Sequence, residues 1–417
     1  MKSLKRVTST MMTLSLLVPT MLSTYHVASA NSVTITLLQN KPEVVNEWNT
    51  LIKNFEKSHP GITVKQVNPP NIDLALQADV AKGQVPDLVA MGDDATYISM
   101  AKHGIFTSWQ GRKELKLVAP AYVKMLENSV GNPTPYALPY TINAVPVLYN
   151  VTLMKKYHVA IPKTWNQLIA DAQKIKKAGG TAFYNGWKDS WTLAVPWNAL
   201  TTNNEPANFQ HLLVTGKASF IKSDKVAASD MITLAKYGQA NEFGTDYNDA
   251  NSGFANGKGV FYLQGTWVLP VLRADNPKVK IGSFVFPATN NPKKTKMVSG
   301  VDSLLAVTNS GDTAKEQAAQ TFVDFLLSKT NGGNYANIAG TFSTVRGVKA
   351  KDPAIAGLQT YIDAGRVIDF DDHYYPAAMA AGNQYESSLQ GSLSTQQSVT
   401  SILKSLDTMY QSAIAHQ

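Results

Sequence analysis

The 417-residue sequence contains no cysteine. Disulfide bonds, thiolate metal sites and cysteine nucleophiles are therefore excluded. Only 16% of the residues are charged and 44% are hydrophobic, a composition that indicates a globular protein and not a disordered one. Because the chain is longer than a single compact domain, we expect two or three folded units.

A concentrated basic surface is also missing. The formal net charge is +8, and the one tight basic cluster, at 293–296, is interpreted as a solvated turn. Without Lys2, Lys5 and Arg6 the chain has 35 basic and 30 acidic residues, a net charge of +5. A nucleic-acid-binding protein needs a basic stripe, so nucleic acid is not an expected partner.

The motifs of common catalytic sites are absent as well. The seven histidines form no His-x-x-x-His pair, and no Gly-x-Ser-x-Gly motif occurs. The glycine-rich run 253–258 is one residue short of a phosphate loop and is followed by Gly259. The acidic run from Asp369 to His373 lacks the spacing of a calcium loop and is interpreted as a solvated loop. We expect no metal, no cofactor and no catalysis.

The first thirty residues have the organisation of a secretory signal peptide. A basic start is followed by an apolar-rich stretch at 7–22 and by the small residues Ala28-Ser29-Ala30, which fit a cleavage site. Polar residues interrupt the apolar stretch, which is too short for a stable membrane span. We expect residues 1–30 to be removed, and the exported protein to begin at Asn31.

The next seventy residues alternate between the two periodicities of strands and helices. Strands are predicted at 33–37, 62–67 and 85–91, and helices at 44–55, 74–82 and 97–103. This alternation predicts a parallel sheet with right-handed crossovers. Ligands of such sheets bind outside the carboxyl ends of the strands, where the chain carries Gln39, Asn40, Asp93 and Asp94.

A second strand–helix unit begins near residue 145. Val145, Val147 and Tyr149 alternate in a short apolar run, which predicts a buried strand. Thr164 followed by Gln167 forms a capping-box pattern, and apolar residues then repeat at helical spacing up to 175. A strand that crosses from one region of the chain therefore leads into a new helical region.

The motifs of this stretch occur in an order that is specific to one family. Pro139-Tyr140, Leu148-Tyr149-Asn150 and Pro162-Lys-Thr164-Trp165 resemble the hinge and second lobe of family 1 extracellular solute-binding proteins. These proteins serve carbohydrate ABC importers and include the maltose and multiple-sugar-binding types. Similar matches follow at 254–267, 300–307 and 341–348, so the resemblance covers nearly the whole exported chain.

The resemblance implies an α/β, two-lobed periplasmic-binding-protein-like fold of type II. Each lobe would be a parallel-rich sheet flanked by helices, and hinge crossings would join the lobes. The N-terminal lobe would comprise 31–140 and 303–345, and the C-terminal lobe 141–302 and 346–417. The missing cysteine is a departure, because lipid-modified cysteine is the usual anchor of such proteins in single-membrane bacteria.

Sugar recognition needs flat aromatic faces together with groups that hydrogen-bond hydroxyls. The resemblance places a stacking aromatic at Trp267 and a carboxylate at Asp93, whereas Asp94 is the better candidate for a helix N-cap. Trp187 and Trp191 would share a face if they were helical, a spacing that is commoner in a core. The full set of candidate ligand-binding residues is Gln39, Asp93, Asp94, Tyr140, Asn143, Trp187, Trp267, Asp302, Arg346, Tyr374 and Tyr375.

The expected protein is a secreted, extracytoplasmic receptor at the cell surface or in the periplasm, and it is not a cysteine-anchored lipoprotein. It is expected to be a monomer that binds an oligosaccharide and docks on the permease subunits of an ABC importer. Alternatives with the same fold are receptors for a glycerol phosphodiester, a polyamine or a metal chelate. Alternatives from other classes are a secreted glycan-degrading enzyme, which would need two opposed carboxylates, and an adhesion module.

Overall fold

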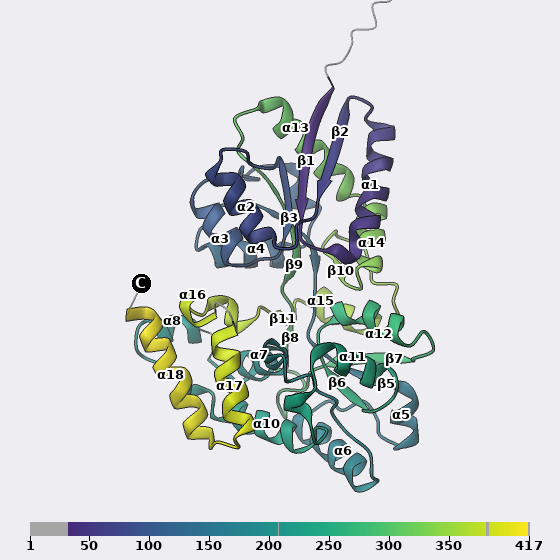
Figure 1. Ribbon diagram of the computed structural model, residues 1–417, viewed down its shortest axis with the longest axis vertical. Coiled ribbons are helices and arrows are strands. Elements are labelled where there is room, and N and C mark those ends of the chain that lie inside the picture. Colours follow the sequence, from purple (N-terminus) through teal and green to yellow (C-terminus); the bar gives the residue numbers. More distant parts are fainter. Residues whose placement is uncertain (1–31, 207, 381–382, 416–417) are drawn as a thin grey trace, which may run out of the picture.

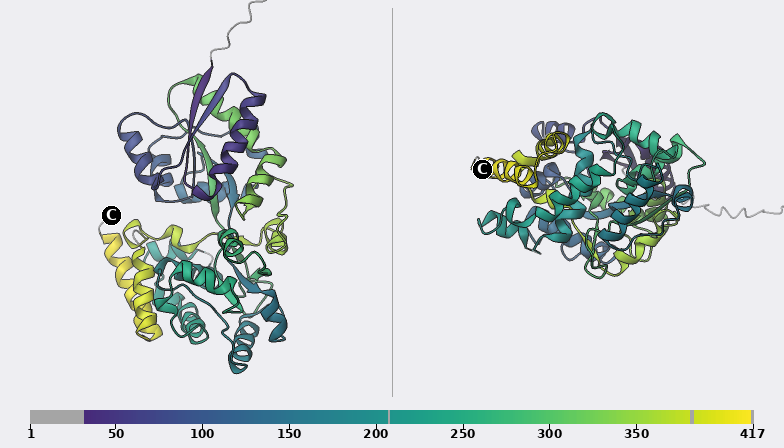
Figure 2. Two further views of the ribbon diagram at one scale, coloured as in Figure 1. Left: turned by 45° about the vertical axis from the view of Figure 1, so that its right-hand side comes forward. Right: turned by 90° about the horizontal axis from the view of Figure 1, so that it is seen from below.

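The computed structural model describes residues 32–206, 208–380 and 383–415 (Figure 1). The predicted signal peptide lies outside the described residues. The described part forms two lobes, one above the other, and the yellow C-terminal helices lie against the lower lobe (Figure 2). Within the described residues, no helix combines the length and apolar character needed to cross a membrane.

The N-terminal lobe is built on a six-stranded sheet with the order β10-β4-β9-β3-β1-β2. Its strands are β1 (Val33–Gln39), β2 (Ile62–Val67), β3 (Leu88–Met91), β4 (Leu138–Ile142), β9 (Val301–Val307) and β10 (Phe342–Ser343). Its helices are α1 (Val45–Ser58), α2 (Ile72–Ala81), α3 (Ala95–Lys102), α4 (Pro120–Val130), α13 (Thr313–Leu326) and α14 (Lys329–Ile338), with 3₁₀ turns η1 (Pro42–Val44) and η2 (Lys113–Lys116).

The predicted alternation of strands and helices in this lobe is confirmed. β1 pairs in parallel with both β2 and β3, while β9 pairs with β3 and β4 in the antiparallel sense. On one face of the sheet Trp48 and Phe55 of α1 pack with Phe322 of α13 in a fully buried core. The parallel strands therefore end at one edge of the sheet, which faces the other lobe.

The C-terminal lobe contains a three-stranded sheet, β6-β5-β7, and a strand pair, β11-β8. The strands are β5 (Pro146–Asn150), β6 (Phe261–Leu263), β7 (Ile281–Val285), β8 (Met297–Val298) and β11 (Val367–Ile368). The helices are α5 (Val151–Lys156), α6 (Trp165–Lys177), α7 (Ala194–Asn204), α8 (Phe209–Val214), α9 (Phe220–Ser223), α10 (Lys225–Lys236), α11 (Tyr247–Ala255), α12 (Leu269–Asp275), α15 (Gln359–Asp363), α16 (Ala377–Ala380), α17 (Gln384–Ser394) and α18 (Val399–Ala415). The 3₁₀ turns are η3 (Ser190–Leu193), η4 (Glu242–Gly244), η5 (Thr266–Val268), η6 (Ala356–Leu358) and η7 (Asp371–Tyr374).

The prediction of a parallel-rich sheet in each lobe is wrong for the C-terminal lobe. β5 pairs with β6 and with β7 in the antiparallel sense, and only the short β8–β11 pair is parallel. β5 leads away from the hinge, and because β6 and β7 run opposite to it, they lead back towards the hinge. Helices cover this small sheet, so most of the lobe's core is helical.

The hinge consists of chain crossings that hydrogen-bond to one another. Asn143 N donates to Gly300 O at 3.1 Å, and Val145 N donates to Val298 O at 2.9 Å. β4 ends at Ile142 and β9 begins at Val301, each two residues from the predicted lobe boundary. Ser299 N donates to Ile368 O at 2.9 Å, so the segment after β11 also starts beside the hinge.

The predicted start of α6 is confirmed with a small change in its capping. Thr164 is the N-cap, and its side chain accepts a hydrogen bond from Gln167 N at 3.3 Å. The Gln167 side chain accepts from Lys163 N at 2.7 Å, one residue before the amide that a capping box uses. Both bonds satisfy backbone donors at the point where the chain enters the C-terminal lobe.

Candidate functional site

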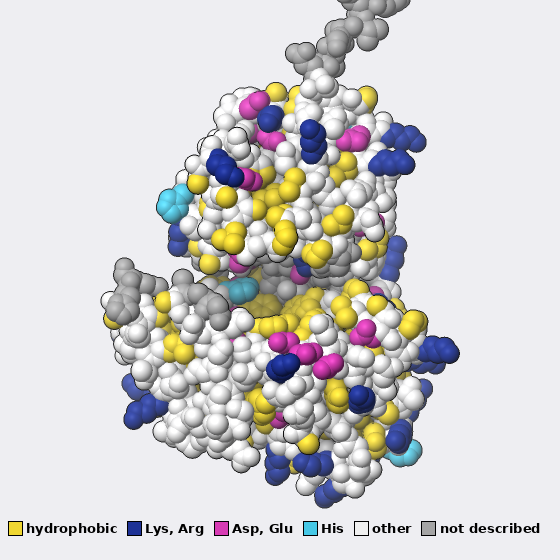
Figure 3. All heavy atoms as spheres, in the orientation of Figure 1, with side chains coloured by type: hydrophobic (Ala, Val, Ile, Leu, Met, Phe, Trp, Pro, Cys, Tyr) yellow, Lys and Arg dark blue, Asp and Glu magenta, His cyan; other side chains and the backbone are white. Residues whose placement is uncertain are grey.

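A cavity of about 1040 Å³ lies between the two lobes and is called the main cleft below. Its N-terminal wall comes from the turn after β3, from α3 and from Ser129, and its C-terminal wall comes from segments between residues 191 and 414. Figure 3 shows the hollow between the lobes, with hydrophobic side chains inside it. The volume is at the upper end of the range for small-molecule sites, large enough for more than one sugar ring.

The C-terminal wall of the main cleft is rich in aromatic side chains. Trp191 in η3 and Trp267 in η5 line it, and both are partly buried. A Cβ atom at Gly265 would lie 2.0 Å from the Trp267 ring, so only glycine lets the indole fold back over this backbone. The wall is completed by the rings of Phe370, Tyr374, Tyr375, Tyr385 and Tyr410. Tyr375, Tyr385 and Tyr410 are buried, so the faces that can pack against the C–H face of a sugar ring are those of Trp191, Trp267, Phe370 and Tyr374.

The N-terminal wall presents two adjacent carboxylates at the end of β3. Asp94 caps α3, because one of its oxygens accepts from Thr96 N at 2.9 Å and from Tyr97 N at 3.0 Å. Asp93 accepts from the Ser129 hydroxyl at 2.8 Å and is 6% exposed. Burial raises the pKa of Asp93 to about 7 and that of Asp94 to about 6. Both carboxylates line the cleft and can accept hydrogen bonds from a ligand.

Asp93 belongs to a charged cluster that joins the lobes. His373 Nδ1 lies 3.1 Å from Asp369 Oδ1, and the Tyr374 hydroxyl donates to Asp369 Oδ2 at 2.9 Å. Burial disfavours a charge on His373, but the carboxylates of Asp369, Asp372 and Asp93 outweigh it and raise its pKa to about 10. The imidazole is therefore protonated at neutral pH.

This cluster also has the spacing of a metal site. One ligand atom each from Asp93, Asp369 and His373 lies within 4.8 Å of the others. In the absence of a metal ion, the positive ring balances part of the charge of the two carboxylates. The geometry is therefore that of an ion cluster between His373 and the two aspartates.

The solvated loop expected at 369–373 is wrong. Asp369 and Asp371 are only 8% and 5% exposed. The pairing of β11 with β8 holds the start of this segment at the hinge, and Asn198 Oδ1 accepts from Asp371 N at 2.7 Å. These bonds draw the segment between the lobes, where its carboxylates become buried.

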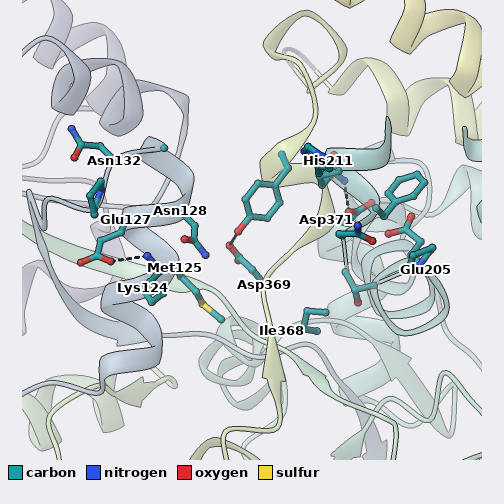
Figure 4. A pocket seen from close by; sticks show the side chains of 18 residues that line it. Lys124, Met125, Glu127, Asn128, Asn132, Glu205, His211, Ile368, Asp369 and Asp371 are labelled. Carbon is teal, nitrogen blue, oxygen red and sulfur yellow. Dashed lines mark hydrogen bonds and ion pairs between the residues drawn. The ribbon is translucent and has the colours of Figure 1, made fainter. Parts of the chain in front are cut away.

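A second cavity of about 680 Å³, called the side cavity, lies next to this segment. Figure 4 shows Lys124 and Glu127 of the N-terminal lobe on one side, Asp369 in the middle, and Glu205 and Asp371 on the other side. Tyr374 lines both the main cleft and the side cavity. The segment that carries Asp369 therefore separates the two cavities.

Three carboxylates lie close together beside the side cavity. Burial, with further contributions from neighbouring carboxylates, raises the pKa of Glu205 to about 12, of Asp224 to about 8 and of Asp371 to about 6. Asp224 is fully buried, and a hydrogen bond from the protonated Glu205 side chain favours its charged form. In the ion cluster a positive imidazole balances the carboxylates. Among the described residues no cation does so here, and the raised pKa values mean that Glu205 and Asp224 hold protons at neutral pH.

Six of the eleven predicted site residues line the main cleft. Asn143 lies at the hinge, where its Oδ1 accepts from Gly300 N at 3.3 Å. The Tyr375 hydroxyl donates to Asp371 Oδ2 at 2.8 Å, so its polar end is already paired. The six residues that the structure brings together are Asp93, Asp94, Asn143, Trp267, Tyr374 and Tyr375.

Tyr140 and Trp187 do not face the cleft. Tyr140 is fully buried in the N-terminal core, with its ring centroid 4.8 Å from that of Tyr335 and 6.0 Å from that of Trp48. Trp187 is 1% exposed and packs against Phe243. It precedes η3 in a turn, so it shares no helical face with Trp191, and only Trp191 reaches the cleft.

The other three candidates are placed outside the cleft lining. Gln39 donates to Gln66 and accepts from Lys41 N, which fixes the turn after β1. Asp302 forms a 2.7 Å ion pair with Lys41 and accepts from the Thr141 hydroxyl at 3.0 Å. Arg346 is exposed, and its backbone N donates to Leu117 O. These residues connect parts of the N-terminal lobe.

Several cleft residues were not among the candidates. Trp191, Phe370, Asp372, His373 and Glu386 all line the main cleft. Burial raises the pKa of Glu386 to about 7, and the Tyr385 hydroxyl donates to Asp372. For Phe370, Asp372 and His373, the sequence signal is the dense mixture of acidic and aromatic residues at 369–375, which is unusual for a solvated loop.

A family model for bacterial extracellular solute-binding proteins matches residues 41–333. The chain belongs to this family. The resemblance seen in the sequence is thereby confirmed, and the chain is an extracytoplasmic binding protein. The family is one of solute receptors, which is consistent with a cleft between two lobes.

Individual relatives agree with this assignment. The chain is 28% identical over 334 residues to the multiple sugar-binding protein of Streptococcus mutans, covering 76% of this chain and 77% of that protein. It is 24% identical over 346 residues to the melibiose/raffinose/stachyose-binding protein MelE of Bacillus subtilis, covering 78% and 77% of the two chains. The apo form of RafE from Streptococcus pneumoniae superimposes with a TM-score of 0.79 at 23% identity, covering 91% of this chain and 97% of RafE. The predicted two-lobed fold is confirmed.

Proposed function

We propose that this chain is an exported receptor that captures an oligosaccharide in the main cleft and delivers it to the membrane permease of an ABC importer. The observation that carries the proposal is the division of the cleft between a C-terminal wall rich in aromatic side chains, which also carries Asp372 and Glu386, and an N-terminal wall that presents the buried carboxylates of Asp93 and Asp94. An aromatic face removes the apolar side of a sugar ring from water, and carboxylates accept hydrogen bonds from its hydroxyls. Asp93 and Trp267 are the residues we assign to these two roles.

This division also gives a reason for lobe closure. A ligand that contacts Asp93 on one lobe and Trp267 on the other makes more contacts when the lobes approach each other. Binding therefore favours the closed state by the difference in contacts, through hinge bending at 143–145 and 299–300. The closed receptor would be the form that docks on the permease.

The names of relatives support the choice of ligand class. The multiple sugar-binding protein of Streptococcus mutans and MelE of Bacillus subtilis are named for sugars, and RafE has been solved in complex with raffinose. We therefore place raffinose-type and related oligosaccharides first among the ligands to be tested.

A polyamine is a second candidate, because carboxylates outnumber cations in the cleft. The side chains that could hold ammonium groups are those of Asp93, Asp94, Asp372 and Glu386. Arg346, which could have bound a phosphodiester, does not line the cleft. A phosphate group would therefore depend on Lys102, His103 and His373, which do.

The test is a thermal-unfolding panel on the chain from Asn31. It covers raffinose-type sugars, maltodextrins, fructo-oligosaccharides, glycerophosphodiesters and spermidine. A ligand at about a hundred times its Kd adds about 2.7 kcal/mol to the free energy of unfolding, which gives a measurable rise in Tm. A rise with one sugar series supports the proposal. A rise with spermidine or a phosphodiester alone would replace the ligand class.

We further propose that the receptor acts as a monomer and without catalytic turnover. Incubation with each sugar of the panel should release no reducing ends beyond one equivalent per protein, and light scattering should give the mass of one chain. Sustained release of reducing sugar would contradict the receptor assignment and favour a glycan-degrading enzyme.

A further inference from the structure

Charged groups from the two lobes meet beside the hinge, where the main cleft and the side cavity adjoin. Asp93 follows β3 in the N-terminal lobe, whereas Asp369 and His373 belong to the segment after β11. One carboxylate oxygen of each aspartate and one ring nitrogen of His373 all lie within 4.8 Å of one another. The imidazole is therefore close enough to act on Asp93 from across the cleft.

His373 is held in place by its own segment. Its Nδ1 lies 3.1 Å from Asp369 Oδ1, and its ring stacks on Phe370 with centroids 5.1 Å apart and 29° between the planes. Asp369 is fixed in turn by the Tyr374 hydroxyl at 2.9 Å and by Phe370 N at 2.8 Å. The positive ring is therefore in position before any ligand arrives.

Asp93 is held from the opposite side. The Ser129 hydroxyl of α4 donates to Asp93 Oδ1 at 2.8 Å. Its neighbour Asp94 is committed to the N-terminus of α3 and cannot swing away without uncapping the helix. The Asp93 carboxylate thus has a hydroxyl donor on one side and the imidazole of the other lobe nearby.

We propose that His373 is a positioning residue for Asp93, and that its positive ring keeps the Asp93 carboxylate ionised as an acceptor for ligand hydroxyls. Ligand affinity should then fall when acidification protonates Asp93. This inference rests on the proposed function, since it concerns the same cleft. His373 is distinct from the groups that stack on a sugar, because its role is exerted through Asp93.

The electrostatic environment supports this role. Burial raises the pKa of Asp93 to about 7, and His373 is the first of the influences that oppose this rise. His373 itself has a pKa of about 10, so it stays charged throughout the range in which Asp93 titrates. The other titratable groups that face Asp93 are Asp94, Tyr97, Asp369 and Tyr374, and Lys102 and His103 line the same cleft.

The direction of the pH effect follows from these charges. Below about pH 7 Asp93 gains a proton, and the neutral carboxyl group is a weaker hydrogen-bond acceptor than the carboxylate. Hydrogen bonds to a charged acceptor are roughly twice as strong as neutral ones, so affinity should fall about tenfold between pH 8 and pH 6. Without His373, the pKa of Asp93 would rise further and the loss of affinity would begin at higher pH.

The experiment measures Kd by calorimetry between pH 5.5 and 9 with the sugar selected by the panel. Wild type is compared with His373→Gln, His373→Arg and Asp93→Asn. We expect His373→Gln to move the midpoint of the profile up by about one pH unit, with affinity recovering near pH 9. His373→Arg retains the positive charge and should keep the midpoint near that of wild type. Asp93→Asn should bind more weakly with a flat profile. A loss in His373→Gln that is equal at every pH would overturn the proposal.

A second measurement does not need a ligand. The ring of His373 is titrated by NMR in the ligand-free chain, in buffer with EDTA, for wild type and for Asp93→Asn. Removal of the Asp93 charge should lower the pKa of His373, and circular dichroism verifies that the variant is folded. An unchanged pKa would overturn the proposal.

The two measurements separate this inference from the proposed function. If no sugar binds but the two groups are coupled in the NMR titration, the ligand class fails and the action of His373 on Asp93 stands. If sugar binds and the coupling is absent, the receptor assignment stands and the role of His373 fails. A calorimetric pH profile that disappears in EDTA would assign a metal ion to the cluster and would also overturn the proposal.

Discussion

The N-terminal wall of the main cleft comes from one short stretch, residues 93–103, with Ser129 added, whereas the C-terminal wall is assembled from segments between residues 191 and 414. The first wall presents two carboxylates at the end of a strand. The second presents aromatic rings from 3₁₀ turns, from helices α17 and α18 and from the segment after β11, with Asp372 and Glu386 among them. One wall is thus built by a single strand–helix turn, and the other by packing of distant segments.

This difference implies different contributions to binding. Aromatic rings contribute through the area that they remove from water, an effect that depends little on direction. A carboxylate contributes through hydrogen bonds whose direction is fixed by the backbone that carries it. We therefore expect the C-terminal wall to supply most of the affinity and the N-terminal wall to select among sugars by their hydroxyls.

The largest expected effect is on the aromatic wall. Trp267→Ala should weaken oligosaccharide binding by roughly 10- to 100-fold, because burial of a large apolar side chain contributes about 1.5–3 kcal/mol. Trp187→Phe is the matched control, since Trp187 is buried in the core of the same lobe. It should lower the free energy of unfolding and leave Kd within about twofold of wild type. Calorimetry measures Kd and urea denaturation measures the free energy of unfolding for both variants. A Kd of Trp267→Ala equal to that of wild type would show that Trp267 does not contact the ligand.

A smaller effect separates the neighbours Asp93 and Asp94 on the other wall. Asp94→Ala removes the N-cap of α3 and should lower the free energy of unfolding by about 1 kcal/mol. Asp94→Asn is the control, because asparagine caps as well as aspartate. Asp93→Asn should leave the fold stable, because it removes a buried carboxylate, but should weaken sugar binding about tenfold. Denaturation and calorimetry on these variants check the division; it would fail if Asp93→Asn bound sugar as wild type does.

The smallest effect concerns the protonated carboxyl group beside the side cavity. The pKa values of Glu205 and Asp224 are raised in the fold, to about 12 and 8, so the folded state holds protons that the unfolded chain releases. Their stabilising contribution is complete below about pH 4 and falls as pH rises, up to about pH 8 for Asp224 and beyond pH 8 for Glu205. Glu205→Gln should reduce this loss by less than about 1 kcal/mol per pH unit, since Glu205 is partly exposed and screened by solvent.

Urea denaturation at pH 5, 6, 7 and 8 measures this slope for wild type and Glu205→Gln. Glu127→Gln is the control, because Glu127 lines the same cavity as part of an exposed pair with Lys124. A wild-type stability that rises from pH 5 to pH 8 would show that these carboxylates are ionised in the fold.

The N-terminal wall could be predicted from the sequence better than the C-terminal wall, because it comes from one strand–helix turn. Asp93 and Asp94 could be placed because parallel strands end at one edge of a sheet, a rule that needs only the order of elements. The prediction that Tyr140 faces the cleft was wrong, although the alternation of side chains along β4 could have shown that Tyr140 faces the core. Leu138 and Tyr140 lie on the same face of the strand, and that face packs against α1 and α14.

The C-terminal wall could not be derived in the same way. Phe370 and His373 reach the cleft because β11 pairs with β8 and because Asn198 binds the backbone of Asp371 and Asp372. These contacts join segments more than 60 residues apart, and no periodicity in the sequence predicts them. Trp267 was found only through the family resemblance.

The most direct test of the account is a crystal structure of the chain from Asn31 with the sugar that stabilises it most. The account predicts a sugar ring packed against Trp267 and a hydroxyl hydrogen-bonded to the Asp93 carboxylate, with the lobes closed around the ligand. A sugar bound in the side cavity or on the outer surface, with the main cleft empty, would contradict it.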